Sequence, residues 1–386
     1  MDKIYNLITE HAIICFSHLR WNLVYQRPHH LMTRFATLST VFYIEEPVFT
    51  TESDHYDLVY RANVAVVTPR LADAPNDKSI PSRIKDILRD LFRSQAITKY
   101  IFWYYTPMAL TFSEEFKPAL VIYDCMDELA AFRFAPPELN ELEVKLFQNA
   151  DLVFTGGYSL YERKKEYHHN IYPLPSSIDA DHFTLAKQTM AKPADQNGIS
   201  HPRFGFYGVI DERFDIDLIY KVAVERPDWN FIFLGPVAKI DVATLPQRPN
   251  VYYLGNKTYD ELPCYLAGWD IAIIPFVKNQ YTEFISPTKT PEYLAAGKPV
   301  ISTSIKDVVD PYGINGLVKI ADTPAEFIRE AKSILSHGMG EKWQQDVEQF
   351  LAGNSWDKTW TSMLELMKLT FDEKNNSLTL KQQHYV

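Results

Sequence analysis

Short apolar runs alternate with stretches of helical pattern along almost the whole chain. The runs that predict strands are residues 12–16, 41–44, 100–105, 119–123, 152–155, 171–174, 204–207, 231–234, 251–254, 271–275, 300–302 and 317–320. Most are continuous rather than alternating in polarity, which is typical of parallel strands covered by helices on both faces. The helical stretches are residues 28–38, 81–96, 136–149, 215–225, 259–267 and 323–337. This alternation predicts an α/β fold built from doubly wound, Rossmann-like parallel sheets.

A polar break divides the pattern into two halves. Residues 180–202 contain few apolar residues but several that favour turns, as expected of an interdomain linker. We therefore expect an N-terminal domain at residues 1–180, a linker at 181–202 and a C-terminal domain at 203–353. A last helix at 354–374 and a frayed tail at 375–386 follow. The helix carries an apolar stripe that must be buried, formed by Trp356, Trp360, Met363, Leu364, Met367 and Phe371.

The composition is that of a globular protein and narrows the range of functions. Of 386 residues, 46% are hydrophobic and 23% charged, and 39 basic against 49 acidic residues give a net charge of −10. That sign disfavours nucleic acid as the main partner. The cysteines, Cys15, Cys125 and Cys264, lie too far apart in sequence to indicate a disulfide framework or a Cys-x-x-Cys metal site.

Nothing in the sequence indicates a membrane span or a signal peptide. No stretch approaches the ~18 consecutive apolar residues of a span, and the start at Met1-Asp2-Lys3 is not that of a signal peptide. We expect a cytoplasmic protein whose contact with the inner face of a membrane, if any, is peripheral. The helix at 81–96 has basic residues beside an apolar stripe, a pattern found on membrane surfaces. Packing of that stripe on its own sheet is the simpler interpretation.

Loops at the carboxyl ends of the predicted strands hold candidate ligand-binding side chains, because open parallel sheets bind ligands there. The candidates are His18, Arg20, Trp21, Asp124 and Asp127 in the first domain and Gly208, Arg213 and Gly235 in the second. Two such faces opposed across a linker would form a cleft, which is a common ligand site.

The stretch 283–303 is the most specific pattern in the chain. It predicts a loop, a short helix and a buried strand. Ser286 and Thr288 bring hydroxyl groups to the start of the helix, where free N–H groups and the helix dipole favour an anion. Lys289 adds a cation, and Glu292 can accept hydrogen bonds from vicinal hydroxyls such as those of ribose. The plainer alternative is a capped helix whose Lys289 and Glu292 face water.

This stretch resembles the donor-binding signature of retaining glycosyltransferases of the glycosyltransferase-B (GT-B) fold, family-4 type. Their pattern is an acidic loop, a helix that begins near a second Glu, and a Gly-x-Pro-Val strand, here residues 297–300. The segment 206–214 resembles the family's strand and glycine loop with a basic residue. The resemblance implies that Glu292 holds the nucleotide ribose, that Arg213 grips the donor diphosphate and that Glu283 contacts the donor. From the anion site at the helix start and the strand-end loops, we expect the donor also to meet Lys289, Ser286, Thr288, Gly208 and Gly235.

The first-domain segments 21–30 and 123–128 resemble a bacterial subgroup near teichuronic-acid and other surface-polysaccharide glycosyltransferases. This resemblance implies that the first domain binds the acceptor. We expect its site to include His18, Arg20 and Trp21 in a strand-end loop and Arg27 and His30 at the start of the next helix. A solvated helix start is the alternative for Arg27 and His30. The family's first Glu falls at Phe284, one place after Glu283, and its first-domain His is absent from a region that holds two Asp residues. The candidate catalytic residues are therefore Asp124, Asp127, Arg213 and Lys289.

The leading hypothesis is a glycosyltransferase that moves a sugar from a nucleoside-diphosphate donor to a saccharide or lipid-linked acceptor. The resemblance implies retention of anomeric configuration, with no bound metal and no other cofactor. It also implies that the helix at 354–374 crosses back to pack on the N-terminal domain. Asp215 and Asp217 lie at a predicted helix start, where capping explains them without a metal. Two alternatives stay open: a nucleotide-sugar epimerase, and a non-catalytic sugar-nucleotide-binding partner in polysaccharide assembly. A dinucleotide-dependent dehydrogenase is disfavoured, because no Gly-x-Gly-x-x-Gly follows any predicted strand.

Overall fold

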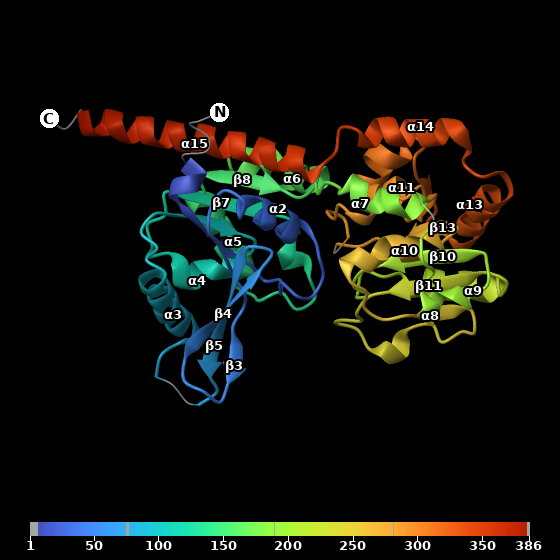
Figure 1. The fold of residues 1–386 in the computed structure, drawn as a ribbon, viewed down its shortest axis with the longest axis horizontal. Helices are drawn as coiled ribbons and strands as arrows, with labels where there is room; N and C mark the ends of the chain where they lie inside the picture. The colour runs from blue at the N-terminus through green and yellow to red at the C-terminus, as the bar shows by residue number, and fades with distance from the viewer. Residues whose placement is uncertain (1–6, 75–76, 189, 281, 384–386) are drawn as a thin grey trace. The chain divides into compact units, whose positions relative to one another are not determined.

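The chain folds into two compact units (Figure 1). A computed structural model describes residues 7–74, 77–188, 190–280 and 282–383, with side chains described up to residue 376. Unit 1 comprises Met1–Pro175 and Asp357–Val386, and unit 2 comprises Ser176–Trp356. The first six residues, which bear on the signal-peptide expectation, lie outside the described part of the chain.

Unit 1 is built on a largely parallel sheet. Within its described residues, nine strands pair in the order β3-β5-β2-β1-β6-β7-β8-β9, with β4 added antiparallel to β5. The central β1 pairs on both sides, Ile13 lying opposite Val41 and Ile101, and its residues from Ile13 to Phe16 are buried. The strands are β1 (Ala12–Phe16), β2 (Val41–Ile44), β3 (Val48–Thr50), β4 (His55–Arg61), β5 (Val64–Ala72), β6 (Tyr100–Tyr104), β7 (Leu120–Cys125), β8 (Leu152–Thr155) and β9 (Ile171–Pro173).

The strands β3, β4 and β5 are absent from the prediction. A two-residue turn joins β4 to β5, and its residues Ala62 and Asn63 have φ of 46° and 67°. Two positive φ values are typical of a tight hairpin whose twist matches that of the strands. The strand β4 mixes polar with apolar residues and is nowhere fully buried, so a search for continuous apolar runs does not find it.

Helices cover the sheet of unit 1. They are α2 (Arg27–Phe35), α3 (Ile80–Ser94), α4 (Leu110–Ser113), α5 (Leu139–Asn149), α6 (Tyr158–Lys164) and the 3₁₀ turns η1 (Pro107–Ala109), η2 (Leu129–Ala131) and η3 (Lys165–Tyr167). The helix α3 turns Ile84 and Ile87 onto Leu71 of β5 and Arg83 onto Asp54. Its apolar stripe is therefore buried on its own sheet, as the simpler interpretation expected.

The helix α15 (Trp356–Gln383) belongs to unit 1 from Asp357 onward. The Trp360 ring lies 6.2 Å from the Phe35 ring, and the Phe371 ring lies 5.8 Å from that of His11. Met363 and Met367 are completely buried, so the apolar stripe is covered. The backbone is helical to Gln383, which differs from the frayed tail expected from residue 375.

Unit 2 is built on a fully parallel sheet. In its described residues six strands pair in the order β12-β11-β10-β13-β14-β15. Counted from β10, this is the 3-2-1-4-5-6 order of a Rossmann fold. The strands are β10 (Arg203–Tyr207), β11 (Asn230–Leu234), β12 (Val251–Tyr253), β13 (Ile271–Ile274), β14 (Val300–Ser302) and β15 (Lys319–Ile320).

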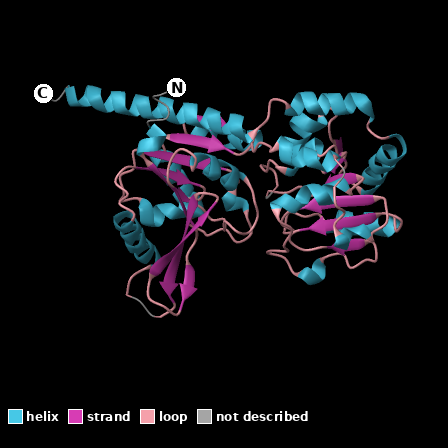
Figure 2. Cartoon of the chain, in the orientation of Figure 1, coloured by secondary structure: helices cyan, strands magenta, loops and turns pink. Residues whose placement is uncertain are grey.

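Helices lie on both faces of this sheet (Figure 2). The helix α9 packs against α13, and α11 packs against α7 and α14. The helices of unit 2 are α7 (Ala180–Thr184), α8 (Ala194–Asn197), α9 (Ile216–Glu225), α10 (Leu262–Ala267), α11 (Lys289–Ala295), α12 (Lys306–Val308), α13 (Pro324–His337) and α14 (Gly340–Leu351). Its short turns are η4 (Leu185–Lys187), η5 (Val242–Thr244), η6 (Tyr259–Glu261) and η7 (Val309–Gly313).

The expected linker at 181–202 is instead part of unit 2. It contains α7, η4 and α8, and Phe183, Ala186 and Ile199 are buried in the core of unit 2. The few apolar residues of this stretch are spaced so that they reach the core, although their number is small. The chain crosses between the units at Pro175–Ser176 and again at Trp356–Asp357.

Candidate active site

The topology of unit 2 places a ligand site at the carboxyl ends of β10 and β13. These two central strands carry connections that run in opposite directions, which is the switch point where open α/β sheets bind ligands. The loop after β10 begins at Gly208, and the loop after β13 begins at Pro275. The two loops are joined by a hydrogen bond of 2.8 Å from the Val277 amide to the Arg213 carbonyl.

Glu292 lies buried at this point. Its carboxylate accepts a hydrogen bond from the Tyr207 hydroxyl, and its side chain follows Lys289 by one helical turn. Burial raises the pKa of Glu292 to about 7, while the Tyr207 hydrogen bond and the Lys289 charge act in the opposite direction. The Tyr293 hydroxyl accepts a hydrogen bond of 3.1 Å from the Tyr207 amide, which fixes the end of β10 against α11.

Gly208, Gly235 and Lys289 converge beside Glu292. A Cβ on Gly208 would lie 2.5 Å from Cε and 2.9 Å from Nζ of Lys289, so the ammonium group lies directly over this glycine. A Cβ on Gly235 would lie 2.1 Å from the Gly208 carbonyl oxygen. Both amides donate to backbone carbonyls, of Leu234 and Gly255. These glycines therefore supply space for a ligand beside a cation, rather than N–H donors.

Arg213 is held by a buried carboxylate. Its Nε and Nη2 donate to Asp211 at 2.9 and 2.7 Å, and the guanidinium lies 5.9 Å from the centre of the Phe276 ring. Asp211 is only 3% exposed, whereas the Arg213 side chain keeps 22% of its surface in solvent. The carboxylate thus orients a guanidinium that is accessible to a ligand.

The other residues predicted to bind the donor include Ser286, Thr288 and Glu283. Thr288 precedes α11 and makes no capping hydrogen bond with its side chain, and Ser286 is half-buried. Glu283 is exposed, and its carboxylate lies 3.9 Å from Nζ of Lys306. Lys306 also lies near the ring of Phe284. Glu283 is thus drawn to Lys306, and no contact in the described chain joins it to Glu292.

Two candidates in unit 1 are buried and paired with one another. Arg27 is 1% exposed and donates from Nε to the Asp124 carboxylate at 3.0 Å and from Nη1 to the Leu174 carbonyl at 2.7 Å. Asp124 is fully buried, and burial raises its pKa against the opposing effect of Arg27. In this structure the two side chains therefore form a buried ion pair. The roles of Asp124 in catalysis and of Arg27 in acceptor binding stay predictions.

The loop after β1 is also fixed mainly by internal contacts. Glu45 accepts hydrogen bonds from the Trp21 amide at 2.8 Å and from Arg20 at 3.0 Å. Trp21 and His30 are 8% and 3% exposed, because each packs against other aromatic rings. In this structure both side chains contribute to packing, and their role in acceptor binding stays a prediction. Three predicted residues of unit 1 keep solvent-accessible surface: His18, Arg20 and Asp127.

The acidic pair on α9 includes a helix cap. Asp215 accepts a hydrogen bond of 2.9 Å from the Leu218 amide at the start of α9. Within the described residues, no cluster of three or more His, Cys, Asp or Glu side chains is placed to hold a metal ion. The capping interpretation of Asp215 thus has a direct geometric basis.

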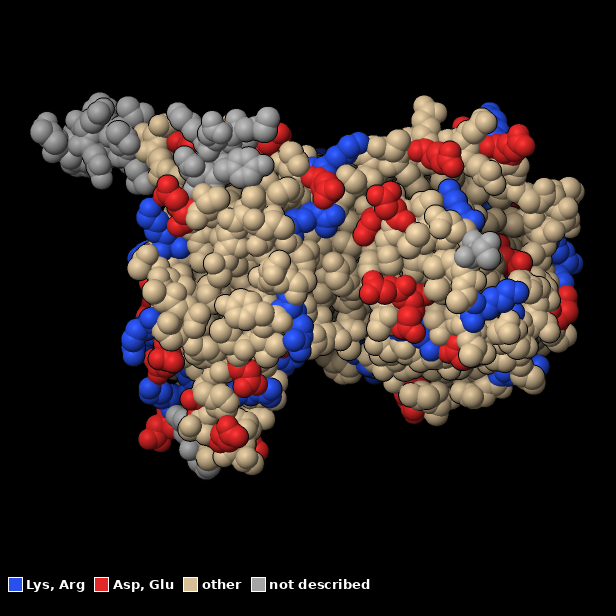
Figure 3. Space-filling model, viewed as in Figure 1, with Lys and Arg blue, Asp and Glu red and all other residues tan. Residues whose placement is uncertain are grey.

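The basic residues of α3 are neutralised by acidic neighbours. Lys85 and Arg89 both pair with Glu115, at 2.7 and 3.0 Å. On the face drawn in Figure 3, basic and acidic side chains are interspersed over the part of unit 1 that contains α3 and β4. No helix in the described parts of the chain has both the length and the apolar content needed to cross a bilayer.

Comparison with known proteins identifies the class of enzyme. Residues 202–337 match the family Glycosyl transferases group 1. Over 292 residues the chain is 26% identical to TuaH of Bacillus subtilis (strain 168), named as a teichuronic acid biosynthesis glycosyltransferase, and this covers 71% of the chain and 72% of TuaH. The chain is a glycosyltransferase of the GT-B fold.

Solved structures share the fold at low identity. Sucrose-phosphate synthase from Thermosynechococcus elongatus is 12% identical with a TM-score of 0.70, covering 94% of this chain and all of that one. Anabaena HepE, solved with UDP and glucose, is 12% identical with a TM-score of 0.64, covering 92% and 98%. At such identities the likeness concerns the fold alone.

Sequence reasoning missed several residues that shape the site of this glycosyltransferase. Tyr207 and Tyr293 hold Glu292 and the end of β10, and Asp211 orients Arg213. Tyr207 lies in a predicted strand, where an aromatic residue indicates only core packing. Asp211 is two residues from Arg213, and that spacing was the one available signal of a pair.

Proposed function

We propose that this glycosyltransferase transfers a sugar from a nucleoside-diphosphate donor bound by unit 2 to a saccharide or lipid-linked acceptor. The proposal is carried by the convergence of Glu292, Lys289 and Gly208 at the switch point of the second sheet. A buried carboxylate beside a cation and an open glycine matches the needs of a ligand with vicinal hydroxyls next to a diphosphate. The name of TuaH supports a surface-polysaccharide acceptor, and HepE with UDP and glucose supports the donor type.

Each group has a distinct role in the proposed reaction. Ionised Glu292 accepts hydrogen bonds from the two ribose hydroxyls, and Tyr207 keeps the carboxylate in place. Lys289 lies over Gly208, where a diphosphate can approach the backbone closely because no Cβ intervenes. Lys289 and Arg213 stabilise the negative charge that develops on the leaving nucleoside diphosphate. We propose that these cations serve without a metal ion and that the reaction retains anomeric configuration.

The acceptor is proposed to bind unit 1 near His18, Arg20 and Asp127, the predicted residues that keep exposed surface. Of these, Asp127 is the one carboxylate that can accept a hydrogen bond from an acceptor hydroxyl, now that Asp124 is assigned to the buried pair with Arg27. The half-buried Ser286 and Thr288 can add hydroxyl donors on the donor side.

Calorimetric titration with UDP, GDP, ADP and dTDP tests donor binding. The preferred nucleotide should bind Lys289→Ala more weakly than wild type by about 1.5–3 kcal/mol, the value of a hydrogen bond to a charged group. Lys221→Ala, which removes an exposed lysine on α9, is the matched control. Equal affinities in Lys289→Ala and wild type would contradict the assignment.

Transfer itself is tested by release of nucleoside diphosphate in the presence of acceptor oligosaccharides. Turnover should persist in EDTA, and NMR of the product should show the anomeric configuration of the donor. Loss of turnover in EDTA with rescue by Mn²⁺ would contradict the metal-free mechanism. Nucleotide binding with no transfer to any acceptor would instead favour the non-catalytic binding partner.

A further inference from the structure

A second pocket lies at the opposite end of the sheet in unit 2. It has a volume of about 580 Å³ and is lined by the segment before β10 and by the end of α10. Arg203 begins β10 and Tyr207 ends it. At about 3.3 Å per residue, the two ends are separated by about 13 Å along the strand. This pocket is therefore distinct from the proposed donor site.

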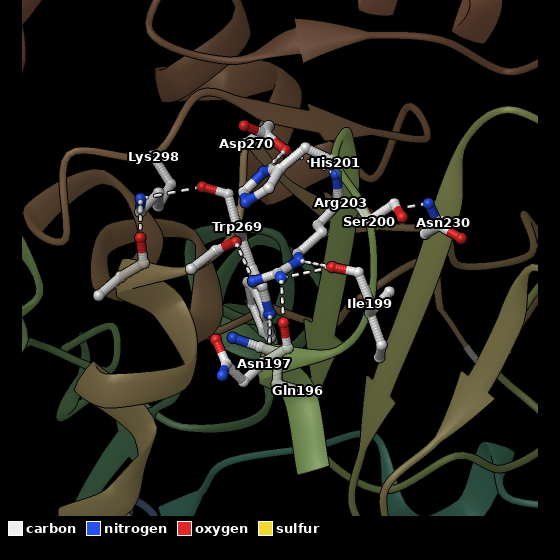
Figure 4. Close-up of polar contacts among 12 residues, drawn as sticks. Gln196, Asn197, Ile199, Ser200, His201, Arg203, Asn230, Trp269, Asp270 and Lys298 are labelled. Carbon is white, nitrogen blue, oxygen red and sulfur yellow. Dashed lines mark hydrogen bonds and ion pairs between the residues drawn. The ribbon is translucent and has the colours of Figure 1, made fainter. Parts of the chain in front are cut away.

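A buried guanidinium forms part of the pocket wall. Arg203 is 7% exposed, and Figure 4 shows its side chain directed toward the loop at Asn197 and Ile199. Its Nε donates to the Ile199 carbonyl at 2.8 Å, Nη1 to Gly268 at 3.3 Å, and Nη2 to Asn197 at 3.4 Å and also to Ile199. All four bonds go to neutral carbonyls, and a guanidinium has a fifth N–H.

The positive charge of Arg203 is thus only partly balanced. Burial lowers the pKa of Arg203, and the charge of Asp270 opposes that effect. Asp270 is itself engaged by the His201 ring at 2.7 Å and by the Arg203 amide at 2.6 Å. A buried cation without a carboxylate on its side chain gains from an anion that binds within reach.

The other basic residues of the lining are Lys192 and His201. Both are exposed, and both line the pocket with Arg203. None of the described lining residues is acidic, although the whole chain has a net charge of −10. The bonds of Arg203 to the Gly268 carbonyl and of Lys298 to the Trp269 carbonyl hold the segment after α10 in place.

We propose that this pocket binds the phosphate group of a small metabolite, at a site separate from the donor site. Arg203 supplies the fixed charge, and Lys192 and His201 close on the oxyanion from the open side. A volume of about 580 Å³ exceeds the needs of inorganic phosphate and is within the usual size of small-molecule sites. A phosphomonoester of sugar size is therefore the preferred form of the ligand.

Cys264 provides a direct test, because it lines this pocket while Cys15 and Cys125 are buried. The rate at which the native protein reacts with a thiol reagent is followed during titration with inorganic phosphate and, separately, glucose 6-phosphate. Both should slow the reaction saturably, and glucose 6-phosphate should be effective at the lower concentration. Cys264→Ser should abolish the signal, and calorimetry with the same two probes gives a second readout that does not depend on the thiol.

Variants separate a built site from a general salt effect. The double variant Lys192→Gln/His201→Gln should raise the half-protecting concentration about tenfold, as expected for the loss of a charge-assisted hydrogen bond. Lys342→Gln, an exposed lysine on α14 outside the pocket, should leave it unchanged. Equal protection of Cys264 by chloride at matched ionic strength would overturn the proposal. Equal protection by phosphate in the double variant and in wild type would also overturn it. So would the loss of phosphate protection on addition of UDP, because the ion would then occupy the donor site.

Discussion

Replacing Glu292 by Gln should change how the stability of the protein depends on pH. Burial raises the pKa of Glu292 to about 7 from its ordinary value of 4.5. Between these values the native protein keeps a proton that the unfolded chain has released, so unfolding becomes more favourable as pH rises. At about 1.4 kcal/mol for each pH unit of this interval, the full effect is about 3 kcal/mol. Glutamine has the same shape and does not ionise.

The measurement is urea-induced unfolding of the ligand-free protein at several pH values from 4.5 to 8. Relative to wild type, Glu292→Gln should gain about 3 kcal/mol between pH 4.5 and pH 7, and the difference should then stay constant. Only the part that changes with pH reports on the carboxyl group, because a constant offset can arise from altered packing. Glu225→Gln, at the exposed end of α9, is the matched control and should follow wild type.

Parallel stability curves for wild type and Glu292→Gln would refute the reasoning. They would mean that Glu292 ionises as readily in the folded protein as in the unfolded chain. A curve that rises with pH in wild type relative to the variant would mean that the Lys289 charge outweighs burial. In either case, the proposed role of a desolvated carboxylate in holding ribose hydroxyls would lose its energetic basis.

Three other substitutions test the donor site, the buried ion pair of unit 1 and the packing of α15. Gly208→Ala should weaken nucleotide binding at least about tenfold, since φ is 130° and the new Cβ would lie 2.5 Å from a lysine side chain, whereas Gly198→Ala, with open space around it, should bind normally in the same calorimetric titration. Asp124→Asn should lower the free energy of unfolding by about 3–5 kcal/mol, because it leaves the buried Arg27 guanidinium without its charge partner. A variant that is stable but inactive would instead favour Asp124 as a catalytic residue. Met363→Ala should lower the free energy of unfolding by about 2–5 kcal/mol in urea, because the Met363 side chain is completely buried. A loss below about 0.5 kcal/mol would show that α15 is not packed as described.

The sheet strands of unit 2 illustrate how far pattern alone reaches. Each of its six described strands overlaps a predicted apolar run. The inner strands β10, β11, β13 and β14 are buried at every position, and a strand buried on both faces needs apolar residues at successive positions. The strand β4 was missed because it lies at an edge of the sheet in unit 1, where one side meets solvent and polar residues are tolerated. The expected linker failed for a related reason, since Phe183 and Ile199 suffice to anchor a mostly polar segment.

The sequence by itself determined that Lys289 and Glu292 would lie on one helix beside a strand end, because their spacing is local and a helix turns every 3.6 residues. Only the tertiary structure decided that Lys289 covers Gly208. It also decided that Tyr207 donates to Glu292, 85 residues away in sequence, and that Arg27 pairs with Asp124, 97 residues away. The types of residue determine which groups can pair, but the order of the strands and the burial of side chains determine which groups do pair. A carboxylate far from any cation in sequence can be an open catalytic group or half of a buried ion pair. For Asp124, the fold of unit 1 decides this, because it places Arg27 of α2 beside β7.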